Sequence, residues 1–450
     1  MNGKNPKNTV KRLIAMFISF LVALCLLSGC AGQNNAGRAS STVETPACGG
    51  DGPVMADNMN YRKTETIKQT MNTGSFDERL LKYLSEHAEG NYMASPLSFR
   101  YALGLLLSGA DKETKTELLN ALGVSSEEEW IEYCLDFNGF VEYFASDLDR
   151  EIEEFRGNVK NGWIPDKTPE PFRALRVANS VWKAERVSQD FKEGYRASVE
   201  KNYAAEYRSF TAANAVEKIN EWADIKTEHM IKRLLPDGYP TEDLAVVLMN
   251  ALYFKDAWQH SFSKVLTKEG DFHTRDNKTA RKYFMTTEGR FPYYEDEETK
   301  IVILPMKGGV SMAFVLGSAE GLSEKISRAG IETVTVTIPK MDLETEYSDG
   351  ELVNFLRESG VKLAFDAEKA DFSAMIDHKV FVSDIIQKTR IKLDEDGVEA
   401  AAVTAIMVTD TAYIEPEQPK VFTADRPFSF FIYTTCNETT AVMFAGEMVE

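Results

Sequence analysis

The fold is decided by residues 393–412, which read LDEDGVEAAAVTAIMVTDTA. With a period of two, one face of a strand here would carry only small or apolar side chains and one threonine. These six side chains are Val398, Ala400, Ala402, Thr404, Ile406 and Val408. The next stretch, YIEPEQP at 413–419, holds two prolines, which cannot donate to a ladder and favour an exposed extended loop. The segment thus has strand chemistry in a loop context, and an alanine-rich helix is an equal alternative.

The chain has 450 residues, which is long enough for two or three domains. Only one continuous stretch, however, has the composition of a globular domain. From Phe76 to Glu450 there is no second linker, repeat or low-complexity tract. Helical patterns come first and strand-like runs later, without alternating βαβ units. This order predicts one large α+β domain over residues 75–450.

Local patterns give the elements of this domain. Ser95-Pro96 suits a helix start and Gly123 suits a helix end. We expect helices at 101–110, 114–122 and 215–235, and a long surface loop at 155–171. We expect strands at 246–254, 300–305, 311–316, 332–338, 380–393, 428–434 and 440–446.

The chain is strongly acidic. It holds 51 basic and 70 acidic residues, which gives a formal net charge of −19. Nucleic-acid binding needs clustered Lys and Arg, so this balance argues against a nucleic-acid partner and favours a cationic one. The hydrophobic and charged fractions, 43% and 27%, exclude a polytopic membrane protein, a collagen-like chain and a mostly disordered chain.

The N-terminus has the pattern of an export signal. Four basic residues at 4–12 precede an apolar run at 13–27, which is short for a membrane span and ends in small residues. Residues 27–30 read LSGC, which resembles the bacterial lipobox, whose cysteine is lipidated and becomes the mature N-terminus. We therefore expect a signal peptide at 1–29 and a lipid on Cys30. A plain signal peptide with an incidental cysteine is the alternative.

Residues 30–74 have the composition of a flexible tether. No aromatic side chain occurs between Ala31 and Asn60, and such a segment cannot bury enough apolar surface to offset its ordering entropy. Loss of the four basic residues of the signal makes the mature charge −19 − 4 = −23. We expect an exported protein, held by its lipid alone on the outside of a bacterial membrane or released from it.

The sequence contains none of the common catalytic motifs. It has no G-x-S-x-G, H-E-x-x-H, G-x-G-x-x-G or phosphate-binding loop, and its five histidines are scattered. Five cysteines form no C-x-x-C pair, which excludes the common zinc and thioredoxin patterns. Four S-x-x-K matches lack the S-D-N and K-T-G partners of a β-lactamase. We expect no enzyme, no metal and no cofactor, and whether Cys134 and Cys436 meet stays open.

Six blocks between Phe76 and Glu450 resemble the serpin family, in the order in which that family has them. They are NYMASPLS at 91–98, VANSVW at 177–182 with LMNALYFKDAW at 248–258, IPKM at 338–341 with ADFS at 370–373, EDGVEAAAVT at 395–404, FTADRPF at 422–428 and FAG at 444–446. The resemblance implies a serpin-like single large domain with three β-sheets, about eight or nine helices and an exposed reactive loop at about 395–420.

The resemblance also implies a suicide-substrate mechanism of serine protease inhibition. A protease attacks the loop and forms an acyl-enzyme, and the cut loop then inserts into a sheet as a new strand. The hinge must enter quickly, and a charge on its buried face would cost several kcal/mol in desolvation. The hinge residues are Glu395, Gly397, Val398, Glu399, Ala400, Ala401, Ala402, Val403 and Thr404.

The position of the cut bond follows from loop length. Counting the family's usual span of about 14 residues from Gly397 places the bond at Thr411–Ala412, within one or two residues. The neighbouring side chains are small and uncharged, which argues against a trypsin-like target. It favours elastase-like or subtilisin-like serine proteases with a small primary pocket. We expect a monomer whose acidity steers cationic proteases towards it.

Two positions depart from the family pattern. Val398 stands where the family usually has Thr or Ser. It is uncharged, so insertion should survive, although its β-branched bulk would slow it. Ser95, Ser98 and Asn250 match a polar cluster beneath the sheet opening, where Gln387 replaces the usual histidine. An amide can still bridge by hydrogen bonds but removes pH sensitivity there. Helix capping is a second role for Ser95 and Ser98.

Two other functions stay open. A non-inhibitory serpin that acts as a binding protein would favour a charged or proline-rich hinge, and residues 395–404 give neither. A lipoprotein enzyme or solute receptor would need a catalytic or ligand-binding constellation, which we do not find in the sequence.

Overall fold

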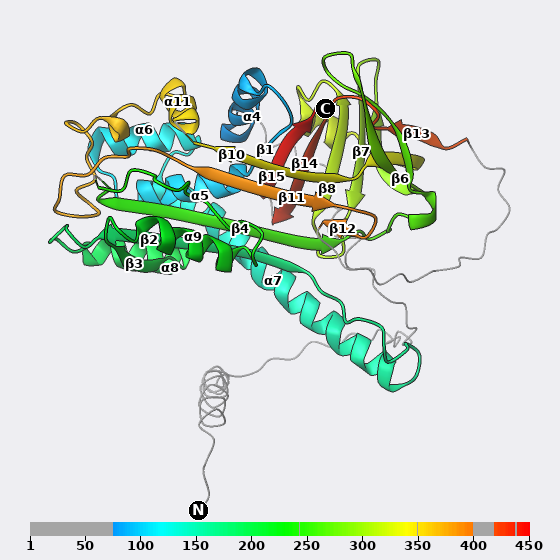
Figure 1. The fold of residues 1–450 in the computed structure, drawn as a ribbon, viewed down its shortest axis with the longest axis horizontal. Coiled ribbons are helices and arrows are strands. Elements are labelled where there is room, and N and C mark those ends of the chain that lie inside the picture. The colour runs from blue at the N-terminus through cyan, green and yellow to red at the C-terminus, as the bar shows by residue number, and fades with distance from the viewer. Residues whose placement is uncertain (1–74, 243, 349, 399–417, 437–438) are drawn as a thin grey trace, which may run out of the picture. The chain divides into compact units, whose positions relative to one another are not determined.

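The computed structural model describes residues 75–242, 244–348, 350–398, 418–436 and 439–450 (Figure 1). The chain separates into a unit Met1–Gly52 and a unit Pro53–Glu450, and every described residue lies in the second. The expected signal peptide at 1–29, the lipid site Cys30 and the tether at 30–74 lie outside the described residues and stay predictions. Among the residues that are described, no helix combines the length and apolarity needed to cross a membrane.

The described residues form eight α-helices and fifteen strands. The helices are α4 (Phe76–His87), α5 (Pro96–Leu107), α6 (Lys112–Leu122), α7 (Glu127–Lys160), α8 (Glu193–Tyr203), α9 (Ala215–Lys226), α10 (Leu322–Ser327) and α11 (Glu351–Glu358). The strands are β1 (Tyr92–Ala94), β2 (Ala174–Ala184), β3 (Glu206–Phe210), β4 (Val246–Ala257), β5 (Lys268–His273), β6 (Thr279–Glu295), β7 (Thr299–Pro305), β8 (Ser311–Gly317), β9 (Gly330–Pro339), β10 (Met341–Tyr347), β11 (Gln387–Leu393), β12 (Gly397–Val398), β13 (Lys420–Thr423), β14 (Phe428–Cys436) and β15 (Thr439–Met448).

The strands form two sheets, and the predicted α+β class is confirmed (Figure 1). One sheet holds six strands in the order β10-β11-β12-β4-β2-β3. The other holds nine, in the order β1-β15-β14-β8-β7-β6-β9-β13 with β5 on β6. Two of the three expected sheets are continuous here, because the 17 residues of β6 pair with β7 at one end and with β5 and β9 along the rest.

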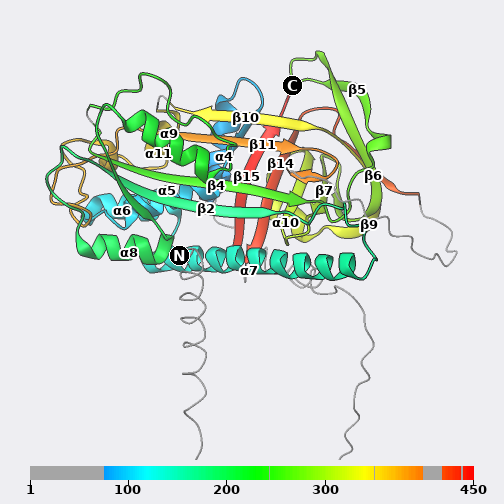
Figure 2. The ribbon, with the colours of Figure 1, turned by 60° about the horizontal axis from the view of Figure 1, so that its bottom comes forward.

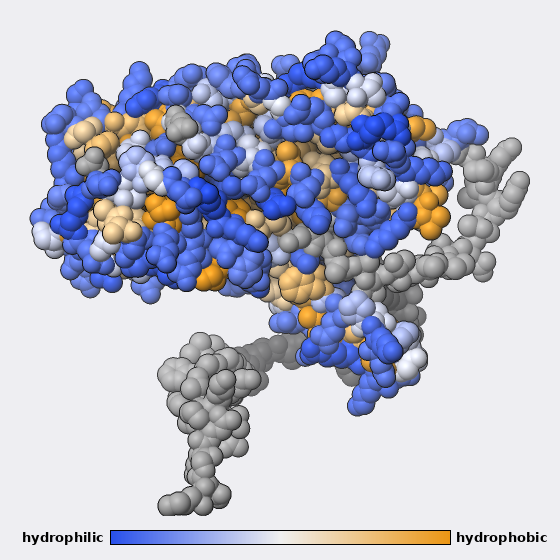
Figure 3. Space-filling view, viewed as in Figure 1, coloured by the Kyte–Doolittle hydropathy of each residue, from blue (hydrophilic) through white to orange (hydrophobic). Residues whose placement is uncertain are grey.

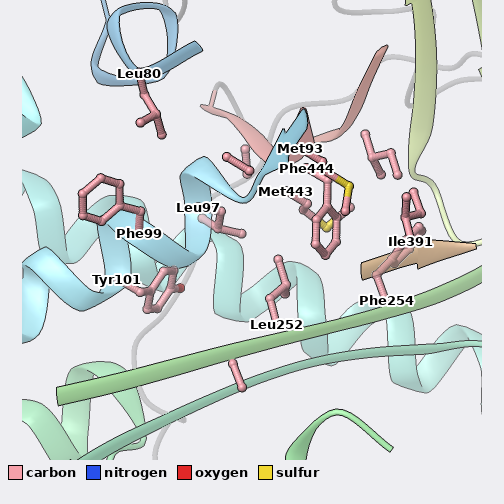
Figure 4. Packing of buried hydrophobic residues seen from close by; sticks show 14 of the residues in the cluster. Leu80, Met93, Leu97, Phe99, Tyr101, Leu252, Phe254, Ile391, Met443 and Phe444 are labelled. Atoms are coloured by element: carbon pink, nitrogen blue, oxygen red, sulfur yellow. The ribbon is translucent and has the colours of Figure 1, made fainter. Parts of the chain in front are cut away.

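Helix α5 supplies the centre of the core, because its sequence is apolar nearly all round. Ser95 caps the helix by accepting a hydrogen bond from the Ser98 N–H, and Pro96 occupies the first turn, where no N–H is needed. Figure 4 shows side chains of α5, β4, β11 and β15 in this core: Leu97, Phe99, Leu252, Phe254, Ile391 and Phe444. On the face seen in Figure 3, polar side chains dominate and hydrophobic ones form small separate groups.

The helix α7 has 34 residues and was not expected from the sequence. Ser126 caps its start, and three glutamates fill its first turn, where they interact favourably with the positive end of the helix dipole. The helix packs on β2, and its last turns extend beyond both sheets (Figures 1 and 2). The loop expected at 155–171 therefore begins only after Lys160.

Two further local expectations were too long. The helix expected at 215–235 ends at Lys226, because the buried Thr227 hydroxyl accepts the Ile231 N–H and the next residues have left-handed backbones. The strand expected at 380–393 is regular only from Gln387, since the Val382 N–H donates to a carbonyl outside the sheet. The helix end at Gly123 and the other six expected strands are present within a few residues of their predicted bounds.

A buried ion cluster ties α7 to the start of β2. The Arg173 side chain, which is only 3% exposed, pairs with the carboxylates of Asp147 and Glu151 on α7. The guanidinium carbon lies 5.4 Å from the centre of the Phe144 ring. Glu151 also receives Lys307, at 3.7 Å.

Replacing Arg173 with methionine should lower the free energy of unfolding by about 3 kcal/mol, because Asp147 and Glu151 would lose their buried cation and keep only the more exposed Arg150 and Lys307. The control is Arg156→Met, which removes the exposed Arg156–Glu170 pair near the end of the same helix and should change stability little. Urea titration measures both variants. Equal losses in the two would contradict the structural role of Arg173.

Candidate functional site

The two-residue strand β12 lies between β11 and β4 (Figure 1). Val398 pairs with Leu393 of β11 and with Asp256 of β4, and Gly397 pairs with Ala257. Both pairings are antiparallel, so β4 and β11 run parallel to each other on either side of β12. Within the described ranges, no other ladder joins these two strands.

The turn at 394–397 carries the chain from β11 into β12. The Asp394 N–H donates to the Gly397 carbonyl at 3.0 Å and closes the turn. Trp258 donates twice, from its main-chain N–H to the Asp396 carbonyl and from its indole Nε1 to the Asp394 carbonyl, each at 3.0 Å. The residue that directly follows β4 therefore fixes the backbone of this turn.

Two ion pairs hold the acidic side chains of the same turn. The Glu395 carboxylate, 5% exposed, accepts hydrogen bonds from Lys340 Nζ and Thr267 Oγ1, each at 2.7 Å. Asp396 pairs with Lys264 Nζ at 2.8 Å. Burial alone would raise the pKa of Glu395, but the hydrogen bonds from Lys340 and Thr267 outweigh it, and the pKa is lowered. Glu395 therefore stays ionised and bound to its lysine.

Position 397 accepts only glycine without displacement of the neighbouring strand. Its φ is +150°, and a Cβ there would lie 2.2 Å from the main-chain oxygen of Asp256 and 2.7 Å from Cα of Ala257. Both atoms belong to the backbone of β4, which cannot rotate away as a side chain could. The close approach of β12 to β4 depends on this missing side chain.

Asp256, which pairs with Val398, is a buried carboxyl beside the hinge. Its oxygens accept hydrogen bonds from the N–H groups of Gly308 and Ala257, both at 2.8 Å. Burial raises its pKa to about 7, despite these hydrogen bonds and the nearby charge of Arg173. The group therefore changes protonation near neutral pH.

A cavity of about 160 Å³ lies between β4 and β11. Its walls come from these two strands, from α5 and α9, and from residues 380–386. Most of the lining is apolar, but Ser95, Ser98, Asn250 and Gln387 also line it. The four residues of the expected sheet-opening cluster thus face one space.

Three of these four residues form one hydrogen-bonded group. The Ser95 N–H donates to Gln387 Oε1, and Gln387 Nε2 donates to the Ser95 carbonyl, both at 2.9 Å. The Ser95 hydroxyl donates to the Met443 carbonyl at 2.6 Å and accepts from the Ser98 N–H at 3.2 Å. Ser95 therefore serves as a helix cap and as the link between α5, β11 and β15.

Asn250 belongs to a separate group on the other side of the gap. Its Nδ2 donates to Asn179 Oδ1 at 2.7 Å, and Asn179 Nδ2 donates to the Tyr203 carbonyl at 2.7 Å. Asn250 Oδ1 is buried and has no hydrogen-bond partner in the described part of the chain. The cluster is thus divided between the two strands that flank the gap.

The comparisons with known proteins agree on the family. The family model described as Serpin (serine protease inhibitor) matches residues 71–450. The chain belongs to the serpin family. Human Serpin B4 is 30% identical over 395 residues, which cover 82% of this chain and 95% of that protein.

Solved structures share the fold. The thermophilic serpin tengpin, in its native state, is 26% identical with a TM-score of 0.65, over 84% of this chain and 93% of that one. Human thyroxine-binding globulin has a TM-score of 0.66 at 20% identity, over 87% of this chain and 98% of that one. At 20% identity, the likeness to thyroxine-binding globulin shows a shared fold and nothing more.

The structure describes only part of the serpin hinge and reactive loop. Glu395, Gly397 and Val398 lie in the turn and in β12. The remaining predicted loop residues lie outside the described residues, and their roles stay predictions: Glu399, Ala400, Ala401, Ala402, Val403, Thr404, Thr411 and Ala412. Cys134 and Cys436 are both buried, each as a thiol, and burial raises the pKa of Cys134.

Sequence reasoning missed the residues that hold the hinge turn in place. Lys340 stands within the IPKM block, but nothing in the sequence shows that it meets Glu395. Lys264 and Thr267 lie in a stretch without any recognisable pattern. Lys340 is 55 residues from Glu395 along the chain, and Lys264 and Thr267 are each more than 120 residues from their partners, so only the fold brings them together.

Replacing Gly397 with alanine should lower the free energy of unfolding by about 1–3 kcal/mol, because the new Cβ would press on the main chain of β4. Gly194→Ala is the control, since a Cβ there meets open space, and it should be neutral or stabilising. Urea titration measures both. An unchanged stability of the Gly397 variant would show that β12 is not held against β4.

The pKa of Asp256 predicts a pH-dependent stability. Its ordinary value is 3.8 and its folded value is about 7, so the native state gains stability as the pH falls between these values. The gain is at most about 1.4 kcal/mol per pH unit and is lost as the pH rises through about 7. Asp256→Asn does not titrate. Its single amide oxygen can accept from only one of the Gly308 and Ala257 N–H groups, and the loss of the other bond is the same at every pH.

Urea titrations of the wild type and the Asp256→Asn variant, from about pH 5 to about pH 8, test this linkage. The difference between their unfolding free energies should change across that window in favour of the wild type at low pH. A difference that is constant with pH would contradict the assignment.

Proposed function

We propose that this serpin inhibits serine proteases by inserting its cleaved reactive loop between β11 and β4. The observation that carries the proposal is β12, which already occupies the first positions of a strand between them. The cavity beyond β12 and the missing ladder between β4 and β11 supply the space. Adding a strand there would satisfy main-chain groups on both flanking strands.

The register of β12 predicts where each loop residue would arrive. Val398 is opposite Leu393 and Asp256, and in an antiparallel ladder each step forward on one strand is a step back on its partners. Continuation in this register brings Ala400 against Ile391 and Phe254. It brings Ala402 against Thr389 and Leu252, and Thr404 against Gln387 and Asn250.

The same register decides which loop side chains would be buried. Val398 is 2% exposed, so residues at even positions after it would face the core. Their neighbours Phe254, Leu252 and Ile391 point into that core beside Phe444 (Figure 4). Small side chains at 400 and 402 would fit between these large ones, and no charge would be buried before Asp410.

Thr404, the polar residue among the inward-facing positions 398–408, would arrive at the polar part of the gap. Thr404 would arrive between Gln387 and Asn250, the two members of the divided cluster that lie on β11 and β4. Its hydroxyl could donate to Asn250 Oδ1, which is buried and lacks a partner in the described residues. This match between the loop sequence and the lining supports an inserted state as part of the serpin's working cycle.

The target class follows from the loop and the charge. We assign the cut bond to Thr411–Ala412 and the target to an elastase-like or subtilisin-like protease with a small primary pocket. The mature charge of −19 − 4 = −23 favours cationic proteases through electrostatic steering. The lipid on Cys30 would place this monomeric inhibitor outside a bacterial membrane.

The proposal predicts opposite outcomes for two neighbouring substitutions. Ala402→Arg would place a charge in the inward row, slow insertion and convert the inhibitor into a substrate, with at least about a tenfold loss of covalent complex. Ala401→Arg is the matched control, because position 401 would face outward. A panel of serine proteases, a denaturing gel and mass spectrometry of the cut loop measure complex formation and the bond that is cut.

Two results would overturn the proposal. Equal complex formation by the Ala401 and Ala402 variants would show that the row opposite Leu252 is not buried during inhibition. Cleavage of the loop by every protease without any covalent complex, and without a gain in thermal stability, would instead support a non-inhibitory serpin that acts as a binding protein.

A further inference from the structure

A second large cavity lies far from the hinge. It has a volume of about 960 Å³ and lies between α4, the first turns of α7 and the nine-stranded sheet. We call it the α4–α7 groove. Its apolar lining includes Phe76, Leu322, Phe431 and Val442. None of the steps of protease inhibition uses this cavity.

Three residues of the lining have a buried polar atom without a partner. Thr440 is 8% exposed, and its hydroxyl has no hydrogen-bond partner among the described residues. The same holds for the Tyr133 hydroxyl and for Arg100 Nε, although Arg100 also contacts Asp77 at 3.4 Å. Each of these atoms is buried within the wall of the groove, so none of them selects the occupant, which must be inferred from the charge of the lining and from what lies beside it.

The lining of the groove is acidic. It contains seven carboxylates and three basic side chains, a balance of 3 − 7 = −4. Arg100 contacts Asp77 and Arg275 contacts Glu447, so two of the three cations are already engaged within the groove. Glu132 and Glu320 are exposed on its rim. An occupant that carries positive charge therefore matches this lining.

The chain itself supplies such a peptide next to the groove. The lining begins at Ser75, the first described residue, so the preceding chain leaves from the edge of the groove. Residues 61–72 read YRKTETIKQTMN, with three basic residues, one acidic residue and the apolar side chains Tyr61, Ile67 and Met71. Fully extended, these twelve residues span about 40 Å, more than the groove requires.

We propose that residues 61–72 dock in the α4–α7 groove of their own chain. Only two residues, Thr73 and Gly74, connect the segment to Ser75, so its effective concentration at the groove is high and a weak intrinsic affinity suffices. Docking would shorten the connection between the membrane lipid and the serpin domain to residues 30–60. It is independent of loop insertion and does not rest on the proposed target.

Limited digestion of the full mature chain with trypsin tests the docking. Residues 399–417 contain no Lys or Arg, so the reactive loop does not compete for the protease. Cleavage after Arg62, Lys63 and Lys68, followed by mass spectrometry, should be at least about tenfold slower than cleavage after Arg38 in the upstream tether. Equal rates at all four sites would overturn the proposal.

Charge reversal tests the site of docking. Glu132→Lys with Glu320→Lys should raise cleavage at Arg62 to the rate seen at Arg38. Glu185→Lys with Glu200→Lys, which changes the net charge equally at exposed positions away from the groove, should keep the protection. Adding Lys68→Glu, which lies six residues from the measured bond, to the groove variant should restore slow cleavage at Arg62.

Two further outcomes would contradict the proposal. Protection that survives the groove variant would place the segment elsewhere on the molecule. Protection that disappears on dilution would mean that the segment of a second copy occupies the groove. Thermal unfolding of each variant, matched to the wild type, confirms that digestion reports on docking rather than on global unfolding.

Discussion

The structure depends on the gap between β4 and β11. Two parallel strands in the middle of a sheet normally satisfy each other's main-chain groups, and here, within the described residues, only β12 links them. Such a gap is unfavourable, because main-chain donors and acceptors away from water need partners. The neighbouring elements must therefore hold the two strands at a fixed separation. The hydrogen bonds, the ion pairs and the glycine of the site hold the strands in this way.

Different kinds of contact hold the strands at the two ends of the gap. At the β12 end, Trp258 and two ion pairs fix the turn, and Gly397 lets β12 approach β4 closely. Farther along, Gln387 clamps β11 to Ser95 at the start of α5, while Asn250 fastens β4 to Asn179 on β2. Gln387 and Asn250 are thus held by different partners, and no hydrogen bond between described residues joins the two across the gap.

Sequence patterns predicted the local features of this arrangement well. The cap at Ser95-Pro96, the helix end at Gly123 and the inward position of Val398 depend on a few neighbouring residues, which period and capping rules describe. The helix α7 escaped notice because its many acids and a central Gly139 hide the buried face formed by Trp130, Phe137 and Phe144. The helix expected at 215–235 was too long because the periodic apolar pattern continues past Thr227, whose side-chain bonds end the helix.

The contacts that hold the hinge could not be predicted in the same way. Lys340 and Glu395, or Ser95 and Gln387, are partners only because strands distant in sequence lie side by side. A single sequence records the chemistry of each residue and not the distance between two of them. The family resemblance narrowed the choice for Gln387 and Asn250, but it did not reveal that they belong to separate hydrogen-bonded groups.

The two buried thiols have a consequence for the redox sensitivity of this fold. Cys134 and Cys436 lie within the hydrophobic core, and burial raises the pKa of Cys134, which keeps its reactive thiolate form scarce. The described part of the chain therefore derives its stability from packing and polar contacts rather than from a covalent cross-link between these two residues. The packing around these two residues therefore does not depend, through a bond between them, on the redox potential of the surroundings.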